Sequence, residues 1–263
     1  MVLLAVIAVS GCQTQQKQKT LGELIDEQTP SLKELSSYQS ERQRRAMNRF
    51  LNLGKDQGGE VVVWFLNDPT VADNERVRVL LSWILSTWKD RRGMPFLLDS
   101  LESRDLGVLS LVEEGFANYG EDDVLARKLG DVLGESRSVD ARRVASSVLS
   151  FMKSDMAVRI LAEHVRKKDE SNREVRGNCL LGVVGGPASE TRLKALVDCL
   201  TDPDVDIRRL SWDALQREER FWRAVNSPKK VTAIYHPASE PVALADSVAS
   251  IRRWLRKYGG TIY

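Results

Sequence analysis

The chain has few of the residues on which metal sites and acyl-transfer catalysis depend. Its 263 residues include two histidines, His164 and His236, which are too far apart to form a His-x-x-x-His pair. Neither Cys-x-x-Cys nor Gly-x-Ser-x-Gly occurs, and Gly185-Gly186-Pro187 lacks the Lys-Ser/Thr that completes a phosphate-binding loop. Because each of these chemistries needs its residues at a set spacing, the sequence predicts no enzymatic activity, no cofactor and no metal.

The chain also lacks a strong charge of one sign. Its 39 Lys and Arg residues nearly balance 37 Asp and Glu residues, for a net charge of +2. No global field therefore draws nucleic acid to the protein, and we expect no nucleic-acid partner. The charge is uneven, however, because residues 217–263 hold nine Lys or Arg against four Asp or Glu. With 42% hydrophobic and 29% charged residues, the composition is that of an ordinary soluble domain.

What the chain does contain is a repeat. An apolar helix face with positions i, i+3, i+4, i+7 and i+8 recurs six times, at anchors spaced 34, 31, 33, 34 and 32 residues apart. The six anchors are Gln43, Val77, Val108, Ala141, Val175 and Ile207. An arginine follows the anchor in five units, with Leu109 as the exception; these arginines are Arg44, Arg78, Arg142, Arg176 and Arg208. A period of this length indicates stacked helical repeats.

Each repeated face follows a second apolar run, and a polar break separates the two. These runs cover residues 61–66, 96–101, 124–133, 158–165 and 193–200. The breaks contain Asp, Ser or Asn, as in Asn67-Asp68-Pro69 and Asp202-Pro203, and such residues cap helix N-termini. The pattern predicts antiparallel helix pairs that must stack on their neighbours to bury both faces.

The sharpest unit reads Asp202-Pro203-Asp204-Val205-Asp206-Ile207-Arg208-Arg209, with Ala214-Leu215 after it. This segment resembles a HEAT repeat, and the resemblance covers roughly residues 31–216. It implies an all-α fold: an α-solenoid of about six HEAT-like helix pairs with a C-terminal helical cap at residues 217–263. It also implies that Asp140, Glu174 and Asp206, each two residues before an arginine, join Arg44, Arg78, Arg142, Arg176 and Arg208 in a polar ladder. Direct contact of these arginines with a partner is the alternative.

The N-terminus indicates export. An apolar run, Met1 to Val9, is too short to cross a bilayer and leads into Ser10-Gly11-Cys12. This sequence resembles a bacterial lipobox, with residues 1–11 as the signal peptide and Cys12 as the lipidated residue. No Lys or Arg precedes the apolar run, so either the start codon is placed too late or the segment is not a signal. In the second case Cys12 is a free thiol.

The following residues extend this interpretation. Residues 12–30 are polar and are predicted to form a disordered tether. By resemblance to Gram-negative lipoproteins, Gln13 favours the periplasmic side of the outer membrane over the inner membrane. The C-terminal segment from Tyr235-His236-Pro237 to Trp254-Leu255 is similar to the tail of bacterial HEAT-containing lipoproteins.

The two remaining cysteines are Cys179 and Cys199, on the inward faces of neighbouring helices. Two small buried thiols are the favoured interpretation. Export permits a disulfide between them instead, provided that their Cα atoms lie within about 7 Å.

Three functions fit these observations. The first is a membrane-anchored, non-catalytic scaffold that binds another protein of the cell envelope, with no small-molecule substrate. The second is a binder of envelope polysaccharide or lipid through the basic C-terminal segment, whose aromatic residues are Phe221, Trp222, Tyr235 and Trp254. These aromatics have an alternative role as a cap on the last repeat. The third is a HEAT-fold enzyme, because fold alone does not exclude catalysis.

Overall fold

The structure, a computed structural model, describes residues 19–37, 40–166, 170–217 and 235–258, with side chains described as far as Arg253. The regular elements in these ranges are all helices, and the ranges contain no strand. The all-α prediction is therefore confirmed. Cys12, the predicted signal peptide, Phe221 and Trp222 lie outside the described residues. The chain divides into two compact units, Met1–Val61 and Val62–Tyr263.

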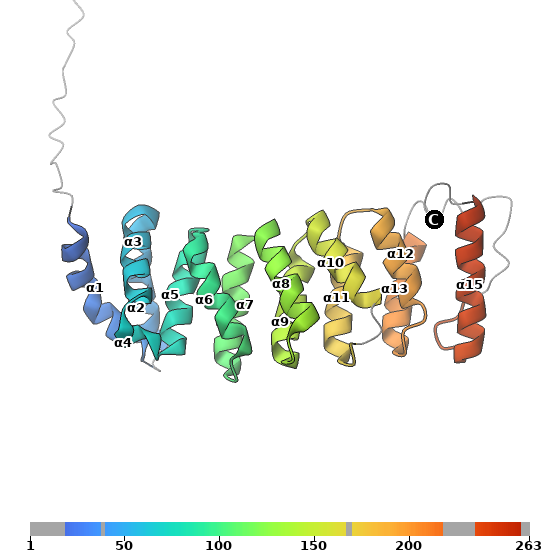
Figure 1. Ribbon diagram of the computed structural model, residues 1–263, viewed down its shortest axis with the longest axis horizontal. Coiled ribbons are helices and arrows are strands. Elements are labelled where there is room, and N and C mark those ends of the chain that lie inside the picture. Colours follow the sequence, from blue (N-terminus) through green and yellow to red (C-terminus); the bar gives the residue numbers. More distant parts are fainter. Residues whose placement is uncertain (1–18, 38–39, 167–169, 218–234, 259–263) are drawn as a thin grey trace, which may run out of the picture. The chain divides into compact units, whose positions relative to one another are not determined.

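The first unit begins with a helix where the sequence predicts a tether. Helix α1 (Leu21–Leu35) packs against α2 (Ser40–Leu51), and α3 (Gly54–Leu66) starts within this unit (Figure 1). A capping box opens α1, in which Thr20 accepts from the Glu23 N–H and Glu23 accepts from the Thr20 N–H. Residues 21–30 are thus helical, which corrects the predicted tether of 12–30.

The tether prediction was wrong for residues 21–30 because α1 has a buried face that packs against α2. Leu24, Gln28, Ser31 and Leu35 follow one another at helical spacing and are all buried. Arg49 on α2 also donates from Nε to Ser31 Oγ at 2.8 Å. Two of the four buried residues, Gln28 and Ser31, are polar. The composition of this segment is therefore similar to that of a disordered one.

The second unit is a succession of helices in two layers. It contains α4 (Pro69–Ala72), α5 (Glu75–Thr87), η1 (Arg91–Gly93), α6 (Met94–Asp99), η2 (Ser100–Glu102), α7 (Leu106–Tyr119), α8 (Asp123–Glu135), α9 (Val139–Phe151), α10 (Asp155–Arg166), α11 (Arg173–Gly185), α12 (Glu190–Cys199), α13 (Val205–Arg217) and α15 (Pro241–Tyr258). Helices α5, α7, α9, α11 and α13 lie side by side in chain order, while α8, α10 and α12 form a parallel row (Figure 1). Every repeated apolar face of the sequence lies on a helix of the first row or on α2.

The predicted polar breaks start the helices. Asp105 accepts hydrogen bonds from two N–H groups at the start of α7, and Asn172 does the same for α11. Ser138 caps α9 through the Ala141 N–H. One break differs from expectation, because Asp68-Pro69 opens the short helix α4, and α5 begins only after a second cap at Asn74.

One continuous hydrophobic core extends through the second unit from Val79 to Ile251. Val144, Val148 and Leu149 of α9 are buried in it, as the repeat register requires. Gly182, which interrupts the apolar pattern of α11, is also buried. A Cβ atom at this position would lie 2.3 Å from Leu161 Cδ1 and 2.8 Å from Ser150 Cα. Only glycine fits between these helices.

The described part of the C-terminal segment joins the same core. Leu244, Val248 and Ile251 of α15 are buried, and so is Tyr235. The Tyr235 hydroxyl donates to the Leu200 carbonyl at 2.7 Å, and its ring lies 4.9 Å from that of Trp212. These contacts favour the predicted capping role for Tyr235. None of the helices in the described ranges is long and apolar enough to cross a membrane.

Candidate functional site

The repeated arginines of the second unit share one contact. In each case Nη1 donates to the backbone carbonyl six residues earlier, at the turn that precedes the arginine's helix. The acceptors are Ser136 for Arg142 (2.9 Å), Glu170 for Arg176 (2.9 Å), Asp202 for Arg208 (2.6 Å) and Ala72 for Arg78 (3.3 Å). Each arginine therefore holds the turn that leads into its own helix.

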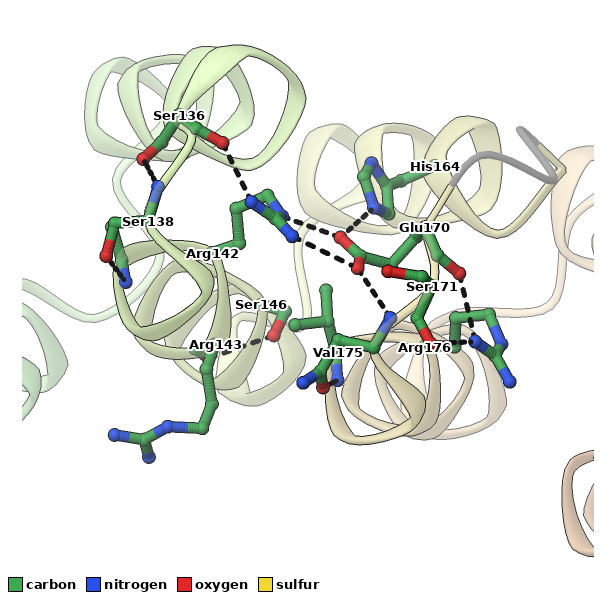
Figure 2. A network of polar contacts seen from close by, with 12 residues as sticks. Ser136, Ser138, Arg142, Arg143, Ser146, His164, Glu170, Ser171, Val175 and Arg176 are labelled. Carbon is green, nitrogen blue, oxygen red and sulfur yellow. Dashed lines mark hydrogen bonds and ion pairs between the residues drawn. The ribbon is translucent and has the colours of Figure 1, made fainter.

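Three of these arginines also reach the next turn along the stack. Arg142 donates from Nε and Nη2 to the two oxygens of Glu170 at 2.7 and 3.2 Å (Figure 2). Arg176 donates from Nε to Asp202 Oδ2 at 3.2 Å. Arg208 donates from Nε to the carbonyl of Pro237 at 2.7 Å. The arginines thus connect successive helix pairs, and residues 235–240 take the place of a further turn.

Glu170 belongs to two of these connections at once. Its carboxylate accepts from Arg142 and from the Asn172 N–H (2.8 Å), and its carbonyl accepts from Arg176. His164 Nε2 lies 3.6 Å from Glu170 Oε2 (Figure 2). Burial acts to raise the pKa of Glu170, but the hydrogen bonds from Arg142 and Asn172 outweigh it and hold the pKa below its ordinary value. The carboxyl group, with 3% of its side chain exposed, therefore remains ionised inside the protein.

The acidic residues predicted for the ladder form a separate, exposed row. Asp140 lies 3.6 Å from Arg143, and Glu174 lies 4.0 Å from the same arginine. Asp206 pairs with Arg173 at 2.6 Å and with Arg209 at 3.8 Å. The carboxylates that meet Arg142 and Arg176 are instead Glu170 and Asp202, which we did not predict. An acidic residue six positions before the next ladder arginine is the sequence signal that marks both.

The first two predicted ladder arginines have other surroundings. Arg44, in the first unit, lies 3.7 Å from Glu41, and both side chains are largely exposed. Arg78 lies 5.6 Å from the centre of the Phe96 ring and 3.9 Å from Asp99. A carboxylate of the next turn therefore meets the ladder arginines of α9 and α11, Arg142 and Arg176.

Two large apolar side chains are exposed on neighbouring helices of this row. Phe151, at the end of α9, is 74% exposed, and Leu181, in the middle of α11, is 52% exposed. Leu181 borders a shallow hollow of about 510 Å³ that also includes Gly177 and Asn178. Phe151 and Leu181 lie on the solvent side of the helices whose N-terminal turns carry the exposed ion pairs.

Cys179 and Cys199 are buried and free. Burial is the main cause that raises the pKa of both thiols. The nearby charge of Glu170 raises the pKa of Cys179 further, and that of Asp202 raises the pKa of Cys199 further. They therefore pack as thiols and do not act as nucleophiles at neutral pH. Within the described residues, no group of three or more His, Cys, Asp or Glu side chains has the arrangement of a metal site.

Comparison with known proteins gives likenesses to solved structures alone. No family model matches the chain, and no curated protein matches its sequence. Among solved structures, human deoxyhypusine hydroxylase in complex with glycerol matches 74% of this chain and 98% of its own, at 17% identity and a TM-score of 0.35. That protein is an enzyme, which contradicts the prediction that this chain is not one, and we withdraw that prediction. Lack of familiar motifs was an insufficient reason for it. A likeness this weak assigns no activity to the chain.

Proposed function

We propose that the chain is a HEAT-repeat lipoprotein of the cell envelope that holds another protein on its surface. About six helix pairs form the solenoid, and a lipid on Cys12 attaches it to the membrane, on the periplasmic side of the outer membrane. The repeat spacing and the arginine contacts between successive turns support the solenoid. The Ser10-Gly11-Cys12 sequence supports the anchor.

The observation that carries the binding role is the exposure of Phe151 and Leu181 on α9 and α11. A contiguous exposed apolar patch is typical of a protein-binding surface, and in this proposal the two side chains belong to one such patch. Arg173 and Glu174 line the same hollow as Leu181, and Arg173 pairs with Asp206, so polar groups border Leu181. We name Phe151, Leu181 and Gly177 the α9–α11 face.

Capture from membranes tests this proposal. The lipidated protein is cross-linked in cells, solubilised in detergent and purified, with Cys12→Ser as the control for anchoring. One envelope protein should be recovered in near-stoichiometric amount with the wild type. Mass spectrometry should show a diacylglycerol on Cys12. Recovery of glycan or lipid without a protein would contradict the proposal and favour polymer binding.

The surface itself is tested by Leu181→Arg and by Val242→Arg. Both side chains are exposed and apolar, but Val242 lies on α15, away from the α9–α11 face. Leu181→Arg should abolish recovery of the partner, whereas Val242→Arg should leave it unchanged. Equal recovery with both variants would rule out the α9–α11 face as the binding surface.

A further inference from the structure

A cleft of about 1060 Å³ lies between α15 and the last turns of the second unit. We call it the C-terminal cleft. Its walls include Val165 at the end of α10, Asp198 and Cys199 of α12, Arg208 of α13, and Leu244, Ala245 and Arg252 of α15. The volume is slightly above the range of ligand pockets, which is roughly 300–1,000 Å³.

Most charges that line the cleft are neutralised within the protein. Arg176 pairs with Asp202 at 3.2 Å, and Arg252 pairs with Asp198 at 2.5 Å. The carboxylate of Glu170 is held by Arg142. Among the charged residues of the lining, Arg208 is the one that is not paired with an opposite charge in these contacts.

Arg208 is bonded to backbone carbonyls alone among the described residues. They are Pro237 through Nε, at 2.7 Å, and Asp202 and Pro203 through Nη1, at 2.6 and 3.0 Å. A carbonyl is a dipole and does not neutralise the guanidinium charge. Arg142 and Arg176 differ in this respect, because each meets a carboxylate of the next turn.

The geometry of Arg142 shows which part of Arg208 remains available. Arg142 uses Nε and Nη2, which form one edge of the guanidinium, to hold both oxygens of a carboxylate. In Arg208 the single oxygen of Pro237 takes Nε, and no described residue accepts from Nη2. The Nη2 atom is not among the buried polar atoms that lack a partner, so it is exposed to solvent, and Arg208 is one of the residues that line the cleft.

We propose that the C-terminal cleft binds a carboxylate carried by a short aliphatic chain, with Arg208 Nη2 as the donor. A monoanion fits better than a phosphate dianion, because Glu170, Asp198 and Asp202 also line the cleft. Val165, Leu244 and Ala245 provide apolar walls for the chain of the ligand. The carboxylate belongs either to a free organic acid or to the C-terminal residue of a peptide. This site does not depend on the protein-binding role proposed above.

Binding is measured by fluorescence polarisation with two labelled pentapeptides. Both end in leucine, and one has a free C-terminal carboxylate while the other is amidated. The free carboxylate should bind saturably and at least about tenfold more tightly than the amide, because a charge-assisted hydrogen bond is lost on amidation. Unlabelled hexanoate serves as the competitor and hexanamide as its control. If hexanoate competes and hexanamide does not, the site also binds free organic acids. If neither competes, the site binds only the C-terminal carboxylate of a peptide.

Two variants locate the site. Ala245→Trp places an indole in the cleft, whereas Ala243→Trp places one on the exposed surface of the same helix, away from the cleft lining. Ala245→Trp should abolish binding of the free carboxylate, and Ala243→Trp should leave the dissociation constant unchanged. Arg208→Gln should also abolish binding, with its folding checked by thermal melting. The proposal fails if neither carboxylate binds, if the amide binds equally well, or if Ala245→Trp binds like the wild type.

Discussion

A single carboxyl group, that of Glu170, links three helices of the second unit. Its partners are Arg142 on α9, His164 on α10 and the N-terminal turn of α11. Burying an ion pair of this kind contributes little by itself, because desolvation offsets the attraction between the charges. Removing one partner is different, since it leaves the other charge buried without compensation. Glu170 therefore matters less for net stability than for fixing which turn meets which arginine.

Glu170→Gln should lower the free energy of unfolding by about 3 kcal/mol at pH 7, because Arg142 would keep its charge and lose its carboxylate. The pKa of Glu170 is lowered in the folded protein, so its stabilisation is present above the ordinary glutamate pKa. It is lost as the pH falls through the lowered value. The difference between wild type and variant should therefore shrink at acid pH. Urea unfolding from pH 7 to pH 3 measures it.

Glu174→Gln is the matched control, since the Glu174 side chain is 62% exposed and its nearest cation, Arg143, is 4.0 Å away. It should change stability little at any pH. A constant difference between wild type and Glu170→Gln across the pH range would contradict the role given to Glu170.

Helix α11 contains glycines of two kinds. Gly182 faces Leu161 and Ser150 so closely that a Cβ atom has no space, whereas a Cβ atom at Gly177 would have nothing within 4 Å. The first glycine allows α11 to approach its neighbours. The second has no packing reason within the described structure and reduces the stability of the helix by its conformational freedom.

These two positions give opposite predictions for the same substitution. Gly182→Ala should destabilise the protein by about 1–3 kcal/mol through overpacking. Gly177→Ala should stabilise it by about 0.5–1 kcal/mol, because alanine is the better helix former. Urea denaturation of the two variants in parallel tests the orientation of α11. A destabilising Gly177→Ala or a neutral Gly182→Ala would mean that α11 is rotated from the position described here.

The helices of the second unit could be predicted because their signals are local. Apolar spacing located α9, α11 and α13, and their capping residues located their starts. Two features could not be predicted in this way. Helix α1 buries Gln28 and Ser31, so its inward face is not apolar. The partners of the ladder arginines lie 26 to 29 residues away in the chain. These partners can be assigned only when the packing of successive turns is known, and the sequence of a single helix does not give that packing.

The C-terminal end of the second unit is closed by residues that are not a helix pair of the repeated type. Tyr235, Leu244, Val248 and Ile251 are buried against the last helices. Pro237 supplies to Arg208 the contact that Glu170 and Asp202 supply to the arginines before it. Stacked repeats need such a cap, because the last pair otherwise exposes its apolar face.

A stop codon at position 235 should lower the melting temperature by roughly 10 °C, since the four buried side chains would be lost together. A stop codon at position 259, after the end of α15, serves as the control. Thermal unfolding followed by circular dichroism gives both values. A truncated protein that melts like the control would show that residues 235–258 do not cap the core.

The same truncation bears on polymer binding. Deleting the basic C-terminal segment removes the cap as well as the candidate binding residues, so lost binding alone would not identify them. Tyr235 already packs on Trp212 and bonds to Leu200. A protein partner on the α9–α11 face makes a sharper prediction, because Leu181 can be changed without disturbing the core.

Photo-cross-linking in cells tests this claim most directly. A photoreactive amino acid is placed at position 181, on the α9–α11 face, or at position 242, an equally apolar exposed position on α15. We predict one discrete cross-linked envelope protein from position 181 and none from position 242. Cross-links from position 242 alone, or no protein cross-link from position 181, would contradict the proposed function.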